Sequence, residues 1–342
     1  MPNVVEMLHH EMERRTTYIN SRNISSIYFG GGTPSLVAPA DIERLIEHAQ
    51  SLFDCSKVEE ITIEANPDDL TPSYVEELAT TSVNRVSVGI QSFDDEALKL
   101  MNRRHTAAEA IEAIGRLRHA GFDNISLDII FGIAGYGGDS LRHSLDQLIG
   151  LNPEHISAYH LIVEEKTRLG LMTQRSEYHP INDELSEQEF LTVHQVLIEA
   201  GYEHYEVSNF AKAGYRARHN SAYWQGVEYL GLGPGAHSFS GDNRTWCIST
   251  AKEYADGIFR YEDEQLTATD HLNEYVMTAL RRCEGIDLRE VEQRFGHDEV
   301  VRLLRCAEQW QREGALQQHD TRLCIPTTRM LISDAIIESL FK

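Results

Sequence analysis

The stretch Ile27-Tyr28-Phe29-Gly30-Gly31-Gly32-Thr33-Pro34-Ser35 decides the fold. An apolar segment typical of a strand runs directly into three glycines, whose backbone can adopt positive φ and approach a ligand closely. Free N–H groups at such a strand end can hold a carboxylate or a phosphate. The spacing is neither G-x-G-x-x-G nor a Walker loop. Taken alone, the stretch therefore fits either a ligand cradle or a turn that only reverses the chain.

The residues on either side extend this pattern into a regular alternation. Six apolar segments are typical of strands, and segments with helical periodicity lie between them. The predicted strands are residues 24–29, 60–64, 85–90, 124–131, 155–161 and 202–207. Such alternation predicts βαβ units and a parallel sheet, either open and doubly wound or closed as a barrel. The Ile and Val content of the strands predicts that helices cover both faces of the sheet.

Polar residues stand where these strands end, which is the edge where parallel sheets bind ligands. They are Gly30 to Thr33, Glu64, Asn66, Gln91, Ser92, Asp128, Tyr159, His160, Glu206, Ser208 and Asn209. A single polar strand end says little, but a whole ring of them predicts a ligand site above the sheet.

Composition narrows the class of protein. The formal net charge is −23, from 31 basic and 54 acidic residues, which argues against nucleic acid as the main partner. No apolar run reaches the ~18 residues that span a bilayer, and the first residues lack the pattern of a signal peptide. The five cysteines are scattered, at no metal-ligand spacing. We therefore expect reduced thiols and a cytoplasmic protein.

Two later regions differ from this alternation. Residues 216–240 concentrate histidines, aromatics and glycines, including His219-Asn220-Ser221-Ala222-Tyr223-Trp224. Rings that stack and an imidazole that coordinates would suit a flat ligand with a metal. The alternative is a structural loop capped by aromatics, which composition alone favours. Residues 270–342 predict three helices, a short β hairpin and a last helix. This is a winged-helix-like pattern without a basic face, so we expect a docking or lid role.

Together these segments resemble the radical S-adenosylmethionine (SAM) family that includes oxygen-independent coproporphyrinogen III oxidase, and within it the heme chaperone HemW branch. The resemblance covers essentially the whole chain. It rests on the order and spacing of the glycine stretch, Ile63 to Pro67, Arg85 to Phe93, Asn102 to His105, the Leu127-Asp128 strand, His219 to Trp224, and Gly231 to Ser238.

The resemblance implies residues that bind the cofactor S-adenosyl-L-methionine. Gly31, Gly32 and Thr33 would hold its amino and carboxylate groups, and Glu64 matches the carboxylate at the next strand end. The other matching residues are Gln91, Arg103 and Asp128. An arginine suits the methionyl carboxylate and an aspartate suits the ribose hydroxyls. The alternatives are a surface charge at a helix end for Arg103 and a buried structural cap for Asp128.

The H-N-x-x-Y-W pattern marks heme binding in the chaperone branch. It implies heme as a ligand of His219, Asn220, Tyr223 and Trp224, with His219 binding the iron or orienting another ligand. The resemblance thus implies a heme chaperone that passes heme to an acceptor protein. The alternative is a coproporphyrinogen III oxidase of porphyrin biosynthesis, and a third possibility is a binding remnant without cofactors. Whether the protein is an enzyme stays open.

One feature departs from the family. Its C-x-x-x-C-x-x-C motif, which holds a [4Fe–4S] cluster, has no counterpart in this sequence, and the segment expected to carry it would precede residue 1. Either the start codon is misassigned or the gene is shortened, and we expect the former. The expected fold is therefore a partial parallel (β/α)6 TIM-like barrel missing its first strand, over residues 1–215. Residues 216–269 form a connecting region with the heme motif, and residues 270–342 a winged-helix-like domain.

Overall fold

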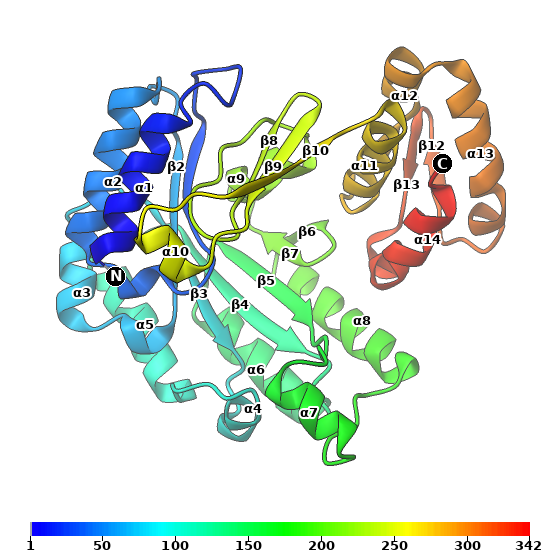
Figure 1. The fold of residues 1–342 in the computed structure, drawn as a ribbon. Coiled ribbons are helices and arrows are strands. Elements are labelled where there is room, and N and C mark those ends of the chain that lie inside the picture. Colours follow the sequence, from blue (N-terminus) through cyan, green and yellow to red (C-terminus); the bar gives the residue numbers. More distant parts are fainter. Residues whose placement is uncertain (1) are drawn as a thin grey trace.

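The computed structural model describes residues 2–342, and its first two thirds alternate strands with helices as the sequence predicts (Figure 1). The helices of this part are α1 (Pro2–Arg14), α2 (Pro39–Leu52), α3 (Pro72–Leu78), α4 (Asp95–Leu100), α5 (Ala107–His119), α6 (Asp139–Gly150), α7 (Arg168–Gln174) and α8 (Asp183–Glu199). The strands are β1 (Ser26–Phe29), β2 (Glu60–Ala65), β3 (Arg85–Gln91), β4 (Ile125–Phe131), β5 (His155–His160), β6 (Glu203–Glu206) and β7 (Asn209–Ala211). Two short 3-10 turns, η1 (Pro34–Leu36) and η2 (Pro67–Asp69), follow β1 and β2.

The seven strands form one curled sheet in the order β1-β2-β3-β4-β5-β7-β6. Strands β1 to β5 are parallel, as expected. The sixth predicted strand differs, because β6 does not pair with β5. Strand β7 lies between them and is antiparallel to both. Only Val207 and Ser208 separate β6 from β7, and so short a loop can join antiparallel neighbours only.

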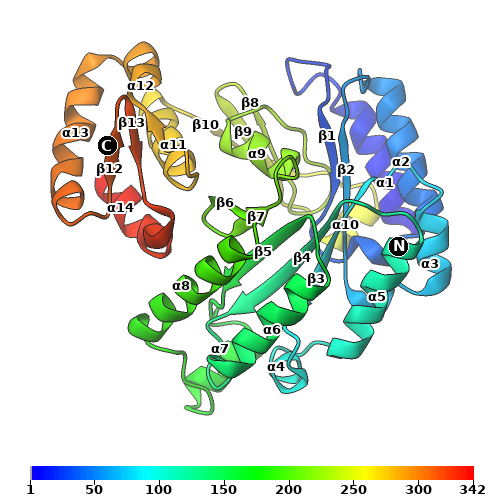
Figure 2. The ribbon, with the colours of Figure 1, turned by 180° about the vertical axis from the view of Figure 1, so that it is seen from behind.

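The two faces of this sheet differ in chemistry. The convex face is apolar and buried under the helices that surround the sheet (Figure 2), with Ile63, Val88, Leu127 and Ile156 all at 0% exposure. The concave face carries the alternate positions, and these are polar. The expectation that helices cover both faces, drawn from the Ile and Val content, is therefore wrong for the concave side. Its side chains are polar because successive side chains of a strand point to opposite faces.

The connecting region contains structure that the sequence did not predict. Helix α9 (Arg218–Trp224) is followed by strands β8 (His237–Ser240) and β9 (Asn243–Cys247), helix α10 (Ala251–Ala255) and strand β10 (Tyr261–Gln265). These strands form an antiparallel sheet in the order β10-β9-β8.

A buried carboxylate attaches this region to α1. Glu11, at 1% exposure, accepts hydrogen bonds from the Gly233 N–H (2.8 Å), the Tyr254 hydroxyl (2.5 Å) and the Tyr261 hydroxyl (2.6 Å). Because a buried carboxylate is costly unless its oxygens are paired, these contacts hold the connecting region in one position against the sheet domain.

The last part of the chain forms a separate lobe, drawn in orange and red in Figure 1. Its elements are α11 (Ala268–Leu280), β11 (Ile286–Asp287), α12 (Leu288–Phe295), α13 (His297–Arg312), β12 (Gln317–His319), β13 (Arg322–Cys324), η3 (Thr327–Ile332) and α14 (Ser333–Leu340). The sheet order β11-β13-β12 completes the expected winged-helix arrangement. The Arg329–Glu187 ion pair (2.9 Å) joins this lobe to α8.

The division of the chain into domains at residues 215 and 269 stays a prediction. Across residues 2–342, none of the helices has the length and apolar content to cross a membrane.

Candidate functional site

The glycine stretch forms an open loop at the end of β1. Gly31 and Gly32 have φ of 73° and 69°, and side-chain-sized space beside both is empty. Gly30 is required for a different reason, since a Cβ there would lie 2.4 Å from the Tyr28 ring. The loop therefore has open space beside Gly31 and Gly32, which a ligand cradle needs and a plain turn does not.

Glu64, near the end of β2, holds the start of this loop. Its carboxylate accepts a 2.6 Å hydrogen bond from the Tyr28 hydroxyl and a 3.2 Å hydrogen bond from the Gly31 N–H. Burial, together with the Glu64 charge, raises the pKa of Tyr28 far above its ordinary value. Tyr28 therefore stays protonated and donates to one carboxylate oxygen of Glu64, while the Gly31 N–H donates to the other.

Gln91 ends β3 in a strained backbone conformation. It is a non-glycine residue with φ of 71°, and the register of β3 against β4 shifts between Gly89 and Gln91. A Cβ on Gly89 would lie 2.7 Å from the Gln91 side-chain nitrogen. The bulge thus folds Gln91 back over Gly89, and both residues line the pocket at the strand ends. Strain and bulges of this kind concentrate at functional sites.

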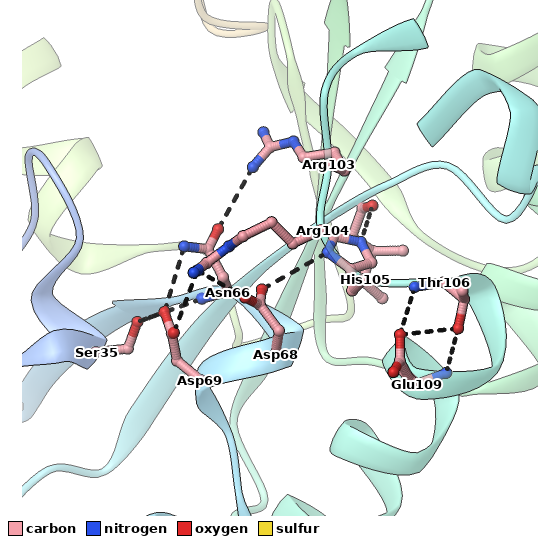
Figure 3. Close-up of polar contacts among 10 residues, drawn as sticks. Ser35, Asn66, Asp68, Asp69, Arg103, Arg104, His105, Thr106 and Glu109 are labelled. Carbon is pink, nitrogen blue, oxygen red and sulfur yellow. Dashed lines mark hydrogen bonds and ion pairs between the residues drawn. The ribbon is translucent and has the colours of Figure 1, made fainter. Parts of the chain in front are cut away.

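Arg103 and Arg104 are neighbours with different surroundings (Figure 3). The exposed Arg104 forms an ion pair with Asp68 (2.6 Å) in η2. Arg103 is half-buried, donates to the Asn66 side-chain oxygen at 3.4 Å, and lines the pocket. His105 attaches this segment to β3, because its Nε2 lies 3.0 Å from the Ile90 carbonyl oxygen. The surface-charge interpretation therefore describes Arg104, whereas Arg103 faces the strand ends.

Asp128 lies on the concave face of β4. Burial raises the pKa of Asp128 to about 6, although hydrogen bonding to Ser157 opposes the shift. The Ser87 hydroxyl lies 3.5 Å from one of its oxygens, too long for a strong bond. Asp128 caps no helix or strand end in this position. Its carboxylate has bonding capacity left for a ligand.

These residues meet in one open pocket. Gly32, Thr33, Glu64, Gln91, Arg103 and Asp128 all line it. They come from the loop after β1, from strands β2, β3 and β4, and from the segment between α4 and α5. Pro34, Ala65, Asn66, Ser87 and Gly89 complete the lining. Gly31 does not line this pocket itself, but its N–H donates to Glu64, which does.

A second cavity continues from this pocket down the concave face, and we call it the lumen. The two share Glu64, Ser87 and Asp128. The lumen is lined by Tyr28, Thr62, Arg85, Ser126, His155, Ser157, Tyr159, Ala217 and Asn220. Sequence reasoning missed most of these residues. Their signal was the period-two alternation of polar and apolar residues within each strand.

The four residues of the heme pattern lie together on α9, against the free edge of β1. Glu60 starts this helix by accepting hydrogen bonds from the Arg218 and His219 N–H groups, both at 2.9 Å. Trp224 ends it with a buried Nε1 that has no hydrogen-bond partner in the described structure. Asn220 faces the lumen.

His219 is held between two tyrosines. Its ring stacks on Tyr28 with centroids 4.6 Å apart, and Tyr223 meets it edge-on at 5.0 Å. Nδ1 lies 2.9 Å from the Ser26 hydroxyl and Nε2 lies 3.3 Å from the Tyr223 hydroxyl. Burial lowers the pKa of His219 to about 4, so the imidazole is neutral at pH 7 and able to ligate a metal.

No group of three possible metal-ligating side chains occurs within residues 2–342, and the five thiols Cys55, Cys247, Cys283, Cys306 and Cys324 are all free. A [4Fe–4S] cluster needs several cysteine thiolates at one place. Such a cluster does not fit the described residues, so we assign it no protein ligand and no role here.

Comparisons with known proteins show which family the chain belongs to. The model of the Radical SAM superfamily matches residues 2–148, and that of the HemN C-terminal domain matches residues 266–328. Heme chaperone HemW of Bacillus subtilis is 33% identical over 295 residues, which cover 84% of this chain and 78% of that protein. Heme chaperone HemW of Mycobacterium tuberculosis is 31% identical over 335 residues, covering 96% and 84%.

The solved structure of coproporphyrinogen III oxidase (HemN) from Escherichia coli, a radical SAM enzyme, superimposes with a TM-score of 0.82 at 21% identity. The match covers 98% of this chain and 82% of that one. It shows a shared fold. The chain belongs to the HemW family of the radical SAM superfamily.

Proposed function

We propose that this protein is a heme chaperone that binds heme at α9 and S-adenosyl-L-methionine at the strand ends. One observation carries the proposal, namely that the two candidate sites meet at Tyr28. Its ring stacks on His219 and its hydroxyl donates to Glu64. A ligand at either site would therefore contact a residue that the other site depends on. The names of the HemW relatives support the assignment of heme.

The strand-end pocket suits the amino-acid end and the ribose of S-adenosyl-L-methionine. Gly32, at positive φ and on the pocket lining, leaves its backbone N–H open for a carboxylate, and Arg103 adds a cation that can pair with it. Glu64 can accept from the ammonium group, and Asp128 can accept from ribose hydroxyls. When bound, this cofactor supplies an activated methionine-derived nucleoside. The chain's own residues bind and orient it.

The α9 block suits heme because it offers a neutral imidazole beside aromatic rings. The bond from His219 Nε2 to the Tyr223 hydroxyl is long, at 3.3 Å, and Tyr223 is 40% exposed. Rotation of that tyrosine frees Nε2 for iron, while Ser26 continues to orient the ring through Nδ1. We further propose that heme is passed to an acceptor protein in the cytoplasm.

A heme titration followed by the Soret band tests the proposal. We expect a shifted Soret band with the wild type and affinity at least about tenfold lower in His219→Ala, because a metal–ligand bond is lost. His237→Ala is the matched control, since His237 lies on nearby β8 and stacks on Trp246 away from α9. An unshifted wild-type spectrum, or equal affinities of wild type and His219→Ala, would overturn the proposal.

The low pKa of His219 allows a second test of the proposal, the pH dependence of heme binding. With a pKa of about 4, the imidazole stays neutral at pH 5.5, where an ordinary histidine is mostly protonated. Heme ligation should therefore persist at pH 5.5 and fall only as the pH approaches 4. A ligation midpoint near pH 6.5 would contradict the buried environment described for His219.

The alternative function, oxidation of coproporphyrinogen III, rests on likeness to the Escherichia coli enzyme, and at 21% identity this shows the fold alone. Anaerobic incubation with coproporphyrinogen III distinguishes the two, provided that the protein is first reconstituted with iron and sulfide and is supplied with S-adenosyl-L-methionine, a reductant and an electron acceptor. Formation of protoporphyrinogen would favour the oxidase, and its absence alongside a His219-dependent Soret band would favour the chaperone.

A further inference from the structure

Arg85 is a buried cation without a carboxylate partner. It starts β3 on the concave face at 3% exposure and lines the lumen. Its Nη1 donates a 2.8 Å hydrogen bond to the Asn124 side-chain oxygen, which is its one side-chain hydrogen bond within residues 2–342. No acidic group of the described chain lies within 4.0 Å of its guanidinium. An unpaired buried charge is unfavourable, so the site is electrostatically incomplete as it stands.

The groups around Arg85 favour an anion. Ser126 and His155 share a 2.7 Å hydrogen bond, and burial together with the nearby Arg85 charge lowers the pKa of His155 well below its ordinary value. The lumen floor thus carries one fixed positive charge and neutral donors. The two carboxylates of the lumen, Glu64 and Asp128, lie at the end that it shares with the strand-end pocket, beyond ion-pair distance from Arg85. The fully buried Thr62 hydroxyl also lines the lumen and has no partner there. Its free O–H is a second donor available to a ligand.

The position of this floor relates it to the heme site. Tyr28, which stacks on His219, and Asn220, the next residue of α9, both line the lumen with Arg85. A ligand bound at His219 would therefore lie beside the lumen, with Tyr28 and Asn220 bordering both. The peripheral groups of heme that carry negative charge are its two propionate carboxylates, and a planar guanidinium pairs with a carboxylate through two parallel hydrogen bonds.

We propose that the lumen is a carboxylate subsite in which Arg85 and Thr62 receive a propionate of the bound porphyrin. This inference rests on the proposed heme function and adds to it the group that orients the porphyrin. It makes Arg85 a specificity-determining residue, because a porphyrin without free carboxylates would leave the buried cation unpaired.

The test compares two probes, heme and iron protoporphyrin IX dimethyl ester, whose carboxylates are blocked. We expect the wild type to bind heme roughly tenfold or more tightly than the ester, since a charge-assisted pair is lost with the ester. In Arg85→Met that preference should disappear, mainly through weaker heme binding, and in Arg85→Lys it should be partly retained. The matched control is Arg142→Met, which removes the same charge from an exposed ion pair with Asp146 on α6.

The outcomes separate this inference from the function on which it rests. Absence of a Soret shift with heme in the wild type contradicts the proposed function. A normal Soret shift with equal affinity for heme and ester, or an unchanged preference in Arg85→Met, contradicts the subsite alone. If Arg85→Met does not fold, as judged by circular dichroism, the wild-type comparison of the two probes still decides.

Discussion

The two faces of the central sheet share the same strands and differ in almost everything else. On β4, Leu127 is fully buried among apolar side chains on the convex face, whereas Ser126 and Asp128 on either side of it face the lumen. The convex face loses water to the surrounding helices and stabilises the fold through apolar burial. The concave face gathers polar and ionisable groups that only ligands can fully pair. Stability and binding are thus assigned to opposite sides of one element.

The comparison also explains where the unsatisfied groups occur. Within residues 2–342, the Thr62 hydroxyl on the concave side has no hydrogen-bond partner and Arg85 has no carboxylate within ion-pair distance. Burial shifts the pKa values of Asp128 and His155 on the same side. Such features concentrate at functional sites and lower the stability of the free protein. Substitutions on the two faces should therefore have opposite signatures.

The largest effect on stability is expected on the convex face. Leu127→Ala removes a buried side chain and leaves a cavity, so we expect a loss of about 3 kcal/mol in the free energy of unfolding. Ser87→Ala, which faces the lumen and pairs in register with Ser126, should change it by less than about 1 kcal/mol. Urea denaturation measures both. Equal losses for the two variants would show that the faces do not divide the work as described.

A smaller effect, on binding, is expected on the concave face at the residue that joins the two sites. Tyr28→Phe keeps the ring against His219 and removes the hydroxyl that donates to Glu64. We expect affinity for S-adenosyl-L-methionine, measured by calorimetry, to fall about tenfold. Tyr74→Phe is the matched control, because the buried Tyr74 hydroxyl has no partner to lose. An unchanged affinity in Tyr28→Phe would remove Glu64 from the proposed site.

The smallest expected effect is a gain in stability, at Asp128 on the concave face. The pKa of Asp128 is about 6 in the folded protein against an ordinary 3.8. Its contribution to stability is therefore greatest below pH 3.8 and is lost as the pH rises through 6. Asp128→Asn should stabilise the free protein by about 1 kcal/mol at pH 7.5 and by nothing at pH 4, while it weakens nucleoside binding. Thermal melts at the two pH values check this, and destabilisation at pH 7.5 would contradict it.

Much of the candidate site could be predicted from the sequence because its parts are local. The glycine stretch, Glu64 and Gln91 each follow a recognisable strand or lie near its end, and Asp128 lies within one, and parallel strands bring such positions to one side of the sheet. Arg103 was anticipated through resemblance alone, since nothing local distinguishes it from Arg104. The structure separates the two because η2 pairs with Arg104 and leaves Arg103 to the pocket. The roles of these residues, like those on α9, stay predictions.

The lumen was not foreseen, although alternation within the strands indicated it. Glu-Ile-Thr-Ile-Glu on β2 and His-Ile-Ser-Ala-Tyr-His on β5 alternate polar and apolar residues. Reading these strands as uniformly apolar concealed the polar face. The position of β6 at the sheet edge, with β7 between it and β5, was likewise missed. Strand order depends on hydrogen bonds between segments that can be far apart in the sequence.

By itself, the sequence determined the βαβ alternation, the curled parallel sheet, the winged-helix-like lobe and the family, because these follow from local periodicity and from motifs in fixed order. Only the tertiary structure decided that His219 meets Tyr28, with 190 residues between them in the chain, and that no carboxylate of the described residues lies within ion-pair distance of Arg85. Contacts of this kind depend on how the sheet curls and where α9 packs against its edge. Those arrangements arise from the sum of many weak interactions across the whole chain, which no single stretch encodes.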